Sequence, residues 1–233
     1  MKKIAVILPA FNESKIIYSV IHNLSNLLTK KGYKFEIIVI NDGSSDDTNL
    51  EAKKAGAKII NHIVNSGAGN ATATGLSYAI KNNFGFAVTM DADGQHLPAD
   101  VLRGIQIMEK GGCDLLIGSR LIENKGMSRL KILGNKGLTF ITYLLFGIRI
   151  TDSQSGLRIF SNKALSSLRW KTGGYEFCSE MIWRAKQSKL KIDEYPIKAV
   201  YTDYSQSKGQ SNWNAINIVK SLVSIRLTEF FSE

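Results

Sequence analysis

The sequence predicts an α/β fold with an open, mostly parallel central sheet flanked by helices. Short apolar runs alternate with helical stripes over the first 120 residues, and this alternation produces parallel strands joined by right-handed crossovers. An apolar fraction of 44% with only 3 prolines is typical of a folded chain. The length of 233 residues fits one large domain, and no internal repeat or linker divides it.

The first half supplies the clearest elements. Residues 4–8 are a continuous apolar run ended by Pro9, as in a strand buried on both faces. Residues 12–31 carry apolar side chains at helical spacing and end at Gly32. Further strands are predicted at 35–40, 57–60, 86–90 and 114–118, and further helices at 46–54, 70–82 and from Pro98 to about Lys110. The second half is less regular, as expected of a region that builds a binding site.

Two carboxylates follow the strand predicted at 86–90. On extended backbone, Asp91 and Asp93 would point to the same side. Like charges held together repel unless a cation lies between them or one carboxyl is protonated. Ligands of open α/β sheets gather at the carboxyl ends of strands, so the run from Asp91 through Gln95 to His96 predicts a divalent cation carrying a phosphate-bearing ligand. The alternative interpretation is a solvated Asp-Gly turn.

Other motifs mainly exclude functions. Gly67-Ala68-Gly69 lacks the third glycine of a dinucleotide fingerprint and does not follow the first strand, so a nicotinamide cofactor is not expected. Its small residues would let backbone approach a ligand or let a helix pack on the sheet. The histidines match no zinc-ligand spacing. Cys113 and Cys178 lie far apart and fit reduced thiols of a cytosolic protein.

The formal net charge is +10, and most of the excess lies in the second half. Residues 1–100 carry 10 basic and 9 acidic side chains, whereas residues 117–171 carry 10 basic and 2 acidic ones. Such a basic surface serves nucleic acid, an anionic membrane or a phosphorylated substrate. No apolar run reaches the roughly 18–20 residues of a membrane-spanning helix, and no signal-peptide pattern is present. We therefore expect a cytoplasmic protein that does not cross the bilayer by itself.

Seven short motifs follow one another along the chain. They are Pro9-Ala-Phe-Asn12-Glu13, Asn41-Asp42-Gly-Ser-Ser-Asp46, Asn65-x-Gly67-x-Gly69-x-Ala71, Asp91-Ala-Asp93-Gly-Gln95-His96, Gly118-Ser119-Arg120, Asp152-x-x-Ser155-Gly156-x-Arg158 and Glu176-x-x-x-Glu180. In this order they resemble family 2 glycosyltransferases of GT-A fold, in the branch similar to dolichyl-phosphate mannose synthase and bacterial polyprenyl-phosphate sugar transferases. The resemblance covers about residues 4–212 and implies a Rossmann-like nucleotide-binding half followed by an acceptor half.

The resemblance implies roles at the donor side of the site. It places a nucleoside diphosphate sugar on the first, second, third and fourth motifs, with Asp42 contacting the base and Mg²⁺ or Mn²⁺ held by the acidic run. The implied donor-binding residues are Pro9, Asn12, Glu13, Asp42, Gly69 and Asp91, and the implied metal ligands are Asp91, Asp93 and Gln95. The family often has a basic residue where this chain has Ala68, which weakens the expected donor contact there.

On the acceptor side, the resemblance makes Arg120 and Arg158 the guanidinium candidates for phosphate oxygens, with Arg129 or Lys131 as a further candidate. Asp152 would act as a general base if the acceptor were a hydroxyl. A lipid phosphate is already anionic at neutral pH, and Asp152 would then orient Arg158 or the metal site. The catalytic set implied is therefore Asp93, Asp152, Arg158 and Arg120.

The function implied is inverting, metal-dependent transfer of a sugar to polyprenyl phosphate, dolichyl or undecaprenyl, at the cytoplasmic membrane face. The alternative within the family is transfer to a saccharide hydroxyl during cell-wall or capsule glycan synthesis. Nucleotidyl transfer that makes the activated sugar is a third interpretation. A nucleic-acid-binding module is not expected, because the basic stretch carries no recognised binding motif and unmetalled Asp91 and Asp93 would repel phosphate.

The C-terminal segment 213–233 follows the catalytic domain predicted at 1–212. Residues 213–231 show a narrow polar stripe at helical spacing on an otherwise apolar helix, and residues 138–148 are similarly apolar. One interpretation is that both helices pack on the domain's own core. The other is that they form an apolar face that lies in the bilayer interface, on a small integral membrane partner or on a second copy of the chain. The second interpretation predicts peripheral association with an anionic membrane surface.

Overall fold

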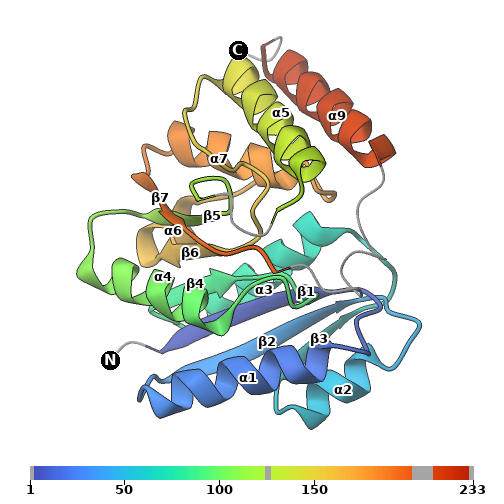
Figure 1. Ribbon diagram of the computed structural model, residues 1–233, viewed down its shortest axis with the longest axis vertical. Helices are drawn as coiled ribbons and strands as arrows, with labels where there is room; N and C mark the ends of the chain where they lie inside the picture. The colour runs from blue at the N-terminus through green and yellow to red at the C-terminus, as the bar shows by residue number, and fades with distance from the viewer. Residues whose placement is uncertain (1–2, 124–126, 201–211, 231–233) are drawn as a thin grey trace.

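The computed structural model describes residues 3–123, 127–200 and 212–230, and within them it has one seven-stranded sheet (Figure 1). The strand order is β3-β2-β1-β4-β6-β5-β7. The strands are β1 (Ile4–Ala10), β2 (Phe35–Asp42), β3 (Lys58–His62), β4 (Phe86–Thr89), β5 (Leu115–Ser119), β6 (Arg158–Ser161) and β7 (Ile192–Pro196). The helices are α1 (Ile17–Lys30), α2 (Thr48–Lys54), α3 (Ala68–Lys81), α4 (Pro98–Lys110), α5 (Arg129–Phe146), α6 (Asn162–Ser167), α7 (Phe177–Gln187) and α9 (Asn212–Phe230).

Strand pairing confirms the mostly parallel sheet. β1 lies parallel to β2 and β4, and β5 lies parallel to β7. β6 is antiparallel to both of its neighbours, β4 and β5. The sequence did not predict β6, because this four-residue strand directly follows a polar motif and shows no alternation of its own. Its direction determines the position of the site described below.

Helices cover both faces of the sheet, and side chains of one strand alternate between them. On β1, Val6 and Leu8 pack with α1 and α4, whereas Ile7 packs with α3 and α7. Each such fully buried aliphatic side chain contributes about 1.5–3 kcal/mol of hydrophobic free energy. Gly75 permits the close approach of α3, since a β-carbon there would lie 2.3 Å from Ile7 Cγ2. Helix packing on the sheet was one of the two roles predicted for the small residues of this helix.

The predicted elements of the first half are present with shifted ends. α1 begins at Ile17 instead of residue 12, because Asn12 adopts a left-handed conformation with φ of 57°. The Asn12 side chain accepts a hydrogen bond from Ser45 N at 2.8 Å and so joins two loops. At the start of α2, Asp47 is the N-cap residue but its side chain makes no capping hydrogen bond, whereas Asp46, one residue earlier, accepts from Thr48 N at 3.0 Å.

α5 and α9 pack side by side at the end of the molecule away from β2 and β3 (Figure 1). Ile218 and Leu222 of α9 are buried in the core, and Glu229 accepts from Arg184 of α7 at 2.5 Å. This face of α9 therefore packs on the domain itself, as the first interpretation predicted. Within the described residues, no helix combines the length and apolarity that crossing a bilayer requires. The predicted boundary at 212 follows residues 201–211, which lie outside the described residues, as do residues 231–233.

Candidate active site

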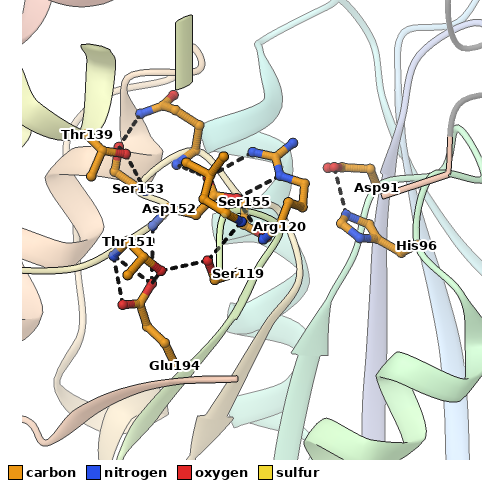
Figure 2. Close-up of polar contacts among 12 residues, drawn as sticks. Asp91, His96, Ser119, Arg120, Thr139, Thr151, Asp152, Ser153, Ser155 and Glu194 are labelled. Carbon is orange, nitrogen blue, oxygen red and sulfur yellow. Dashed lines mark hydrogen bonds and ion pairs between the residues drawn. The ribbon is translucent and has the colours of Figure 1, made fainter. Parts of the chain in front are cut away.

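Three strands bring polar side chains to one edge of the sheet. Asp91 follows β4 and Arg120 follows β5, both at carboxyl ends. Because β6 is antiparallel, the segment that precedes it reaches the same edge, with Arg158 paired opposite Thr89 in the sheet. Asp152, six residues before β6, therefore lies beside Arg120 (Figure 2). The topology thus brings the fourth, fifth and sixth motifs together.

Asp91 lies between a buried histidine and a close-packed glycine. His96 Nε2 contacts Asp91 Oδ2 at 3.0 Å, and the imidazole is buried whereas 52% of the aspartate side chain is exposed. A β-carbon on Gly156 would lie 2.3 Å from Asp91 Oδ1, so only glycine leaves room for this carboxylate. The described residues have two buried side-chain polar atoms without a partner, His96 Nδ1 and the hydroxyl of Ser155. Both belong to this neighbourhood.

The pKa values of Asp91 and Asp93, the two carboxyl groups of the acidic run, shift in opposite directions. About half of the Asp91 side chain is open to solvent, and the protein atoms around the rest would raise its pKa. The His96 hydrogen bond and the charges of Arg120 and Arg158 outweigh this effect and hold the pKa below its usual range. Burial and the negative charge of Asp91 raise the pKa of Asp93. This is the behaviour of two like charges that a cation would relieve.

A hard divalent cation fits the oxygen ligands at this position. Gln95 donates to Asp93 through its backbone N at 3.0 Å and through its side-chain amide at 2.5 Å, which keeps the amide beside the carboxylates. Within the described residues, no group of three His, Cys, Asp or Glu side chains could hold a metal. Two carboxylates completed by ligand phosphates are the arrangement that Mg²⁺ commonly uses. Asp91, Asp93 and Gln95 are therefore compatible with the predicted metal and stay a prediction as its ligands.

Asp152 is bound to Arg120 on both carboxylate oxygens (Figure 2). Arg120 Nε donates to Oδ2 at 2.7 Å and a terminal nitrogen donates to Oδ1 at 2.9 Å. The backbone N of Arg120 and that of Gln154 donate to the same carboxylate at 3.1 and 3.2 Å. Burial would raise the pKa of Asp152, but Arg120 and these hydrogen bonds hold it below its usual range. The pair is a fixed, ionised unit, and Asp152 itself is fully buried.

Arg158 does not reach the ligand side of the site in this structure. Its side chain is buried, and it donates to Ser155 O at 3.0 Å, to Ser153 O at 2.9 Å and to Met181 Sδ at 3.0 Å. The guanidinium therefore holds the turn before β6, and its charge acts on Asp91 from within the protein. These acceptors hold the guanidinium inside the protein, and its contact with phosphate oxygens stays a prediction.

The residues expected at the nucleoside follow β1 and β2. Pro9 lies on β1, and Asn12 and Glu13 follow in the loop to α1, where Glu13 N donates to the Thr48 hydroxyl at 2.7 Å. The negative charge of Glu13 also acts on Asp93, so the first motif does adjoin the acidic run. These three residues stay predicted nucleoside contacts.

Asp42 lies at the end of β2 with its carboxylate buried in the neighbouring loop. Oδ1 accepts from Ser66 N, the Ser66 hydroxyl and His62 Nδ1 at 3.0, 2.7 and 2.7 Å, and Oδ2 accepts from Gly67 N at 2.8 Å. Burial would raise the pKa of Asp42, and these bonds lower it below its usual value. The carboxylate thus organises residues 62–67, and contact with the base stays a prediction.

Gly67 and Gly69 pack closely against the backbone of residues 172 and 173. Gly69 N donates to Gly173 O at 2.7 Å, and a β-carbon on Gly69 would lie 2.4 Å from Thr172 O. A β-carbon on Gly67 would lie 2.3 Å from Gly173 O. The glycines leave room for the segment 172–174, a contact that local sequence pattern does not predict. Contact of Gly69 with the donor stays a prediction.

Tyr175 was missed by the sequence reasoning. Burial and the charges of Asp91, Asp93 and Glu13 raise the pKa of its half-exposed phenol, so the ring is within electrostatic range of the acidic run. Its loop is fixed by buried Glu180, which accepts from the backbone of residues 171 and 172. The seventh motif begins at the next residue, and that adjacency was the one available signal.

Lys131, on the first turn of α5, lies near this site. Burial and the charge of Arg120 lower its pKa, whereas the charge of Asp93 raises it, so the ammonium group is within electrostatic reach of both. Arg129, the other basic candidate, is exposed at the start of α5. Of the two, the structure brings Lys131 to the carboxylates.

The fold is that of a glycosyltransferase of GT-A type. The family model "Glycosyl transferase family 2" matches residues 5–169. The chain therefore belongs to glycosyltransferase family 2, as the seven motifs predicted.

Relatives of similar length match nearly the whole chain. It is 39% identical over 249 residues to a UDP-N-acetylglucosamine–dolichyl-phosphate N-acetylglucosaminyltransferase of Methanococcus voltae, covering 97% of each protein. It is 25% identical to a polyprenol monophosphomannose synthase of Mycolicibacterium smegmatis, covering 94% of this chain and 84% of the relative. A solved structure of Mycobacterium tuberculosis glucosyl-3-phosphoglycerate synthase with Mn²⁺, UDP-glucose and phosphoglyceric acid superimposes with a TM-score of 0.73 at 21% identity, covering 97% and 79%. The last likeness confirms the fold.

Proposed function

We propose that this enzyme transfers a sugar from a nucleoside diphosphate sugar to the phosphate of a polyprenyl phosphate. The two relatives named above act, by their names, on dolichyl phosphate and on a polyprenol phosphate, and one uses a UDP-sugar. The observation that carries the proposal is the ion pair between Asp152 and Arg120. An acceptor hydroxyl needs a base, and Asp152 is buried with both oxygens bound to Arg120. A phosphate acceptor arrives ionised and needs a positive charge instead.

The reaction is a single in-line displacement. An oxygen of the acceptor phosphate attacks the anomeric carbon, the new oxygen–carbon bond forms as the bond to the nucleoside diphosphate breaks, and the configuration inverts. No proton has to leave the nucleophile. We assign to Arg120 the orientation of the acceptor phosphate, and Lys131 adds a second positive charge near Asp93. Asp152 keeps the Arg120 fork in one orientation.

Asp91, Asp93 and Gln95 are the residues that would hold Mg²⁺ or Mn²⁺. A divalent ion bound there offsets the negative charge that develops on the departing diphosphate. His96 and Gly156 determine where the Asp91 carboxylate points, through a hydrogen bond and a steric limit. The structural relative with Mn²⁺ and UDP-glucose supports a metal in this fold.

The test compares acceptors that differ only in the phosphate. Purified enzyme is incubated with Mn²⁺ or Mg²⁺, a panel of radiolabelled UDP- and GDP-sugars, and either undecaprenyl or dolichyl phosphate or the corresponding polyprenol. We expect organic-soluble label with the phosphates and none with the alcohols. Label transferred to the alcohol, or to an added saccharide while the lipid phosphates stay unlabelled, would instead support the hydroxyl-acceptor alternative. No lipid label with any donor would reject the proposal.

An exposed apolar stripe on α5 supports peripheral association with an anionic membrane at its cytoplasmic face. Leu130, Leu133, Phe140 and Leu144 recur at helical spacing and are all exposed, Leu133 by 70% and Phe140 by 58%. The outer face of α9 adds exposed Ile216, Val223 and Leu227. The stripe belongs to the basic stretch 117–171, and each lysine or arginine close to an anionic surface contributes about 1 kcal/mol. This charge favours anionic lipid over a second copy of the same basic chain.

Point substitutions test the membrane face, because α9 contributes buried side chains and cannot be removed cleanly. The double variant Leu133→Ser, Phe140→Ser should lose sedimentation with phosphatidylglycerol liposomes while its melting temperature stays within about 2 °C, since both side chains are exposed. Ile63→Ser is the matched control, because Ile63 is 100% exposed on the loop after β3. Liposome binding that is equal in both variants would exclude this face.

A further inference from the structure

Glu194 on β7 contacts the segment that carries Asp152. Its carboxylate accepts from Thr151 N at 2.7 and 2.9 Å, from the Thr151 hydroxyl at 2.7 Å and from Asp152 N at 3.2 Å. Figure 2 shows Glu194 beneath this segment, on the side away from Asp91. Glu194 pairs with Ile117 of β5 in the sheet, so the strand register fixes its position relative to Arg120, which follows β5.

The same contacts reach Arg120 by a second path. The hydroxyls of Thr151 and Ser119 lie 2.6 Å apart, and Ser119 directly precedes Arg120. Leu121 N donates to the Ser119 hydroxyl at 3.2 Å, so the residues on both sides of Arg120 are tied to this network. Glu194 is therefore connected to the pair between Asp152 and Arg120 in two ways: through Asp152, and through Thr151 and Ser119 to Arg120 (Figure 2).

We infer that Glu194 is a positioning residue that fixes the pair between Asp152 and Arg120 for the acceptor phosphate. This inference rests on the proposed function, in which Arg120 attracts that phosphate. Glu194 lies beyond residue 169, where the family match ends, and none of the seven motifs contains it. Because Glu194 binds backbone nitrogens and a side-chain hydroxyl, it acts through Asp152 and does not need to touch substrate.

A carboxylate matches the donors at this position better than a carboxamide does. Both oxygens accept, and all the donors named are N–H or O–H groups of two adjacent residues. In Glu194→Gln an amide nitrogen would face the Thr151 N–H, so one acceptor is replaced by a donor. The segment must shift to avoid this contact, and the bidentate geometry at Arg120 shifts with it. Misplacement of this size costs about 10- to 100-fold in kcat/KM.

The experiment measures Glu194→Gln in the full-length enzyme. We expect kcat/KM for polyprenyl phosphate to fall about 10- to 100-fold while KM for the nucleotide sugar stays within about twofold. Asp193→Asn is the matched control, because it removes the same charge one residue away from an exposed side chain, and its amide oxygen can still accept from Glu194 N as the carboxylate does. Thr151→Val removes the hydroxyl alone and should give a smaller loss in the same direction.

Two readouts separate this inference from the proposed function. Backbone amide exchange at residues 151 and 152 should accelerate in Glu194→Gln, and the Arg120 Nε–H resonance should move, whichever acceptor the enzyme uses. Unchanged exchange and an unchanged resonance would overturn the inference. So would an equal loss toward donor and acceptor that tracks a lower melting temperature, because that describes general destabilisation. Wild-type enzyme that labels no lipid phosphate would reject the proposed function and leave these two readouts valid.

Discussion

Asp152→Asn tests whether Asp152 is half of a fixed ion pair or a general base. The substitution keeps the shape of the side chain and removes its charge. One oxygen becomes an NH₂ group. In place of Oδ2 it would face the side-chain Nε and the backbone N of Arg120, and in place of Oδ1 it would face the terminal nitrogen of Arg120 and the backbone N of Gln154. In both orientations a donor meets donors, and the Arg120 charge, only 13% exposed, loses its partner.

The expected cost follows from that geometry. Removing one partner of a buried ion pair costs about 3–5 kcal/mol, and the retained amide oxygen favours the lower end. For a chain of this size, about 3 kcal/mol lowers the melting temperature by roughly 6–12 °C. Glu51→Gln is the control, since its partner Lys54 is half-exposed at the surface, and such a pair is worth about 1 kcal/mol or less.

The pH dependence provides an independent check with a definite sign. The pKa of Asp152 is lowered in the folded state, so the unfolded state binds more protons as the pH falls through this range. The stability from Asp152 is therefore fully present above its unfolded pKa of about 3.9 and is lost as the pH falls through the lower folded value. Urea unfolding should show a constant gap between wild type and Asp152→Asn from pH 5 to 8, closing below pH 4. An unchanged melting temperature with a catalytic loss of about 10⁴-fold would refute the ion-pair reasoning and indicate a base.

Two further substitutions test the metal site and the third motif. Asp93→Asn should abolish turnover yet raise the metal-free stability by about 1 kcal/mol, since burial and the charge of Asp91 raise the pKa of Asp93 and its ionised form costs stability as the pH rises. The variant should also lose the Mn²⁺-induced rise in melting temperature that calorimetry measures in the wild type. A retained rise would contradict the ligand assignment. Gly69→Ala should cost about 2 kcal/mol in urea unfolding because its β-carbon meets Thr172 O, whereas Gly134→Ala on exposed α5, with no atom within 4 Å, should gain up to about 1 kcal/mol. Equal effects of the two alanines would reject the steric argument.

The sequence by itself determined the parallel half of the sheet and the family. Buried strands such as β1 and β2 are continuous apolar runs, and each ends in polar motif residues, so local pattern identified both the strands and the edge that carries the site. It also placed Asp91 and Asp93 after a strand, and the structure puts them where their charges interact with each other. These features depend on residues close together along the chain, and periodicity reports them directly.

The tertiary structure decided which polar residues face a ligand and which hold the protein together. Arg120 and Arg158 look equivalent as sequence, but the antiparallel course of β6 buries Arg158 among backbone carbonyls and leaves Arg120 with Asp152. Gly69 also accommodates a segment about a hundred residues away, a contact that its motif does not predict. Glu194 carried no motif at all. The physical reason is that a hydrogen bond between distant segments depends on strand order and direction, and the local spacing of residue types predicts neither.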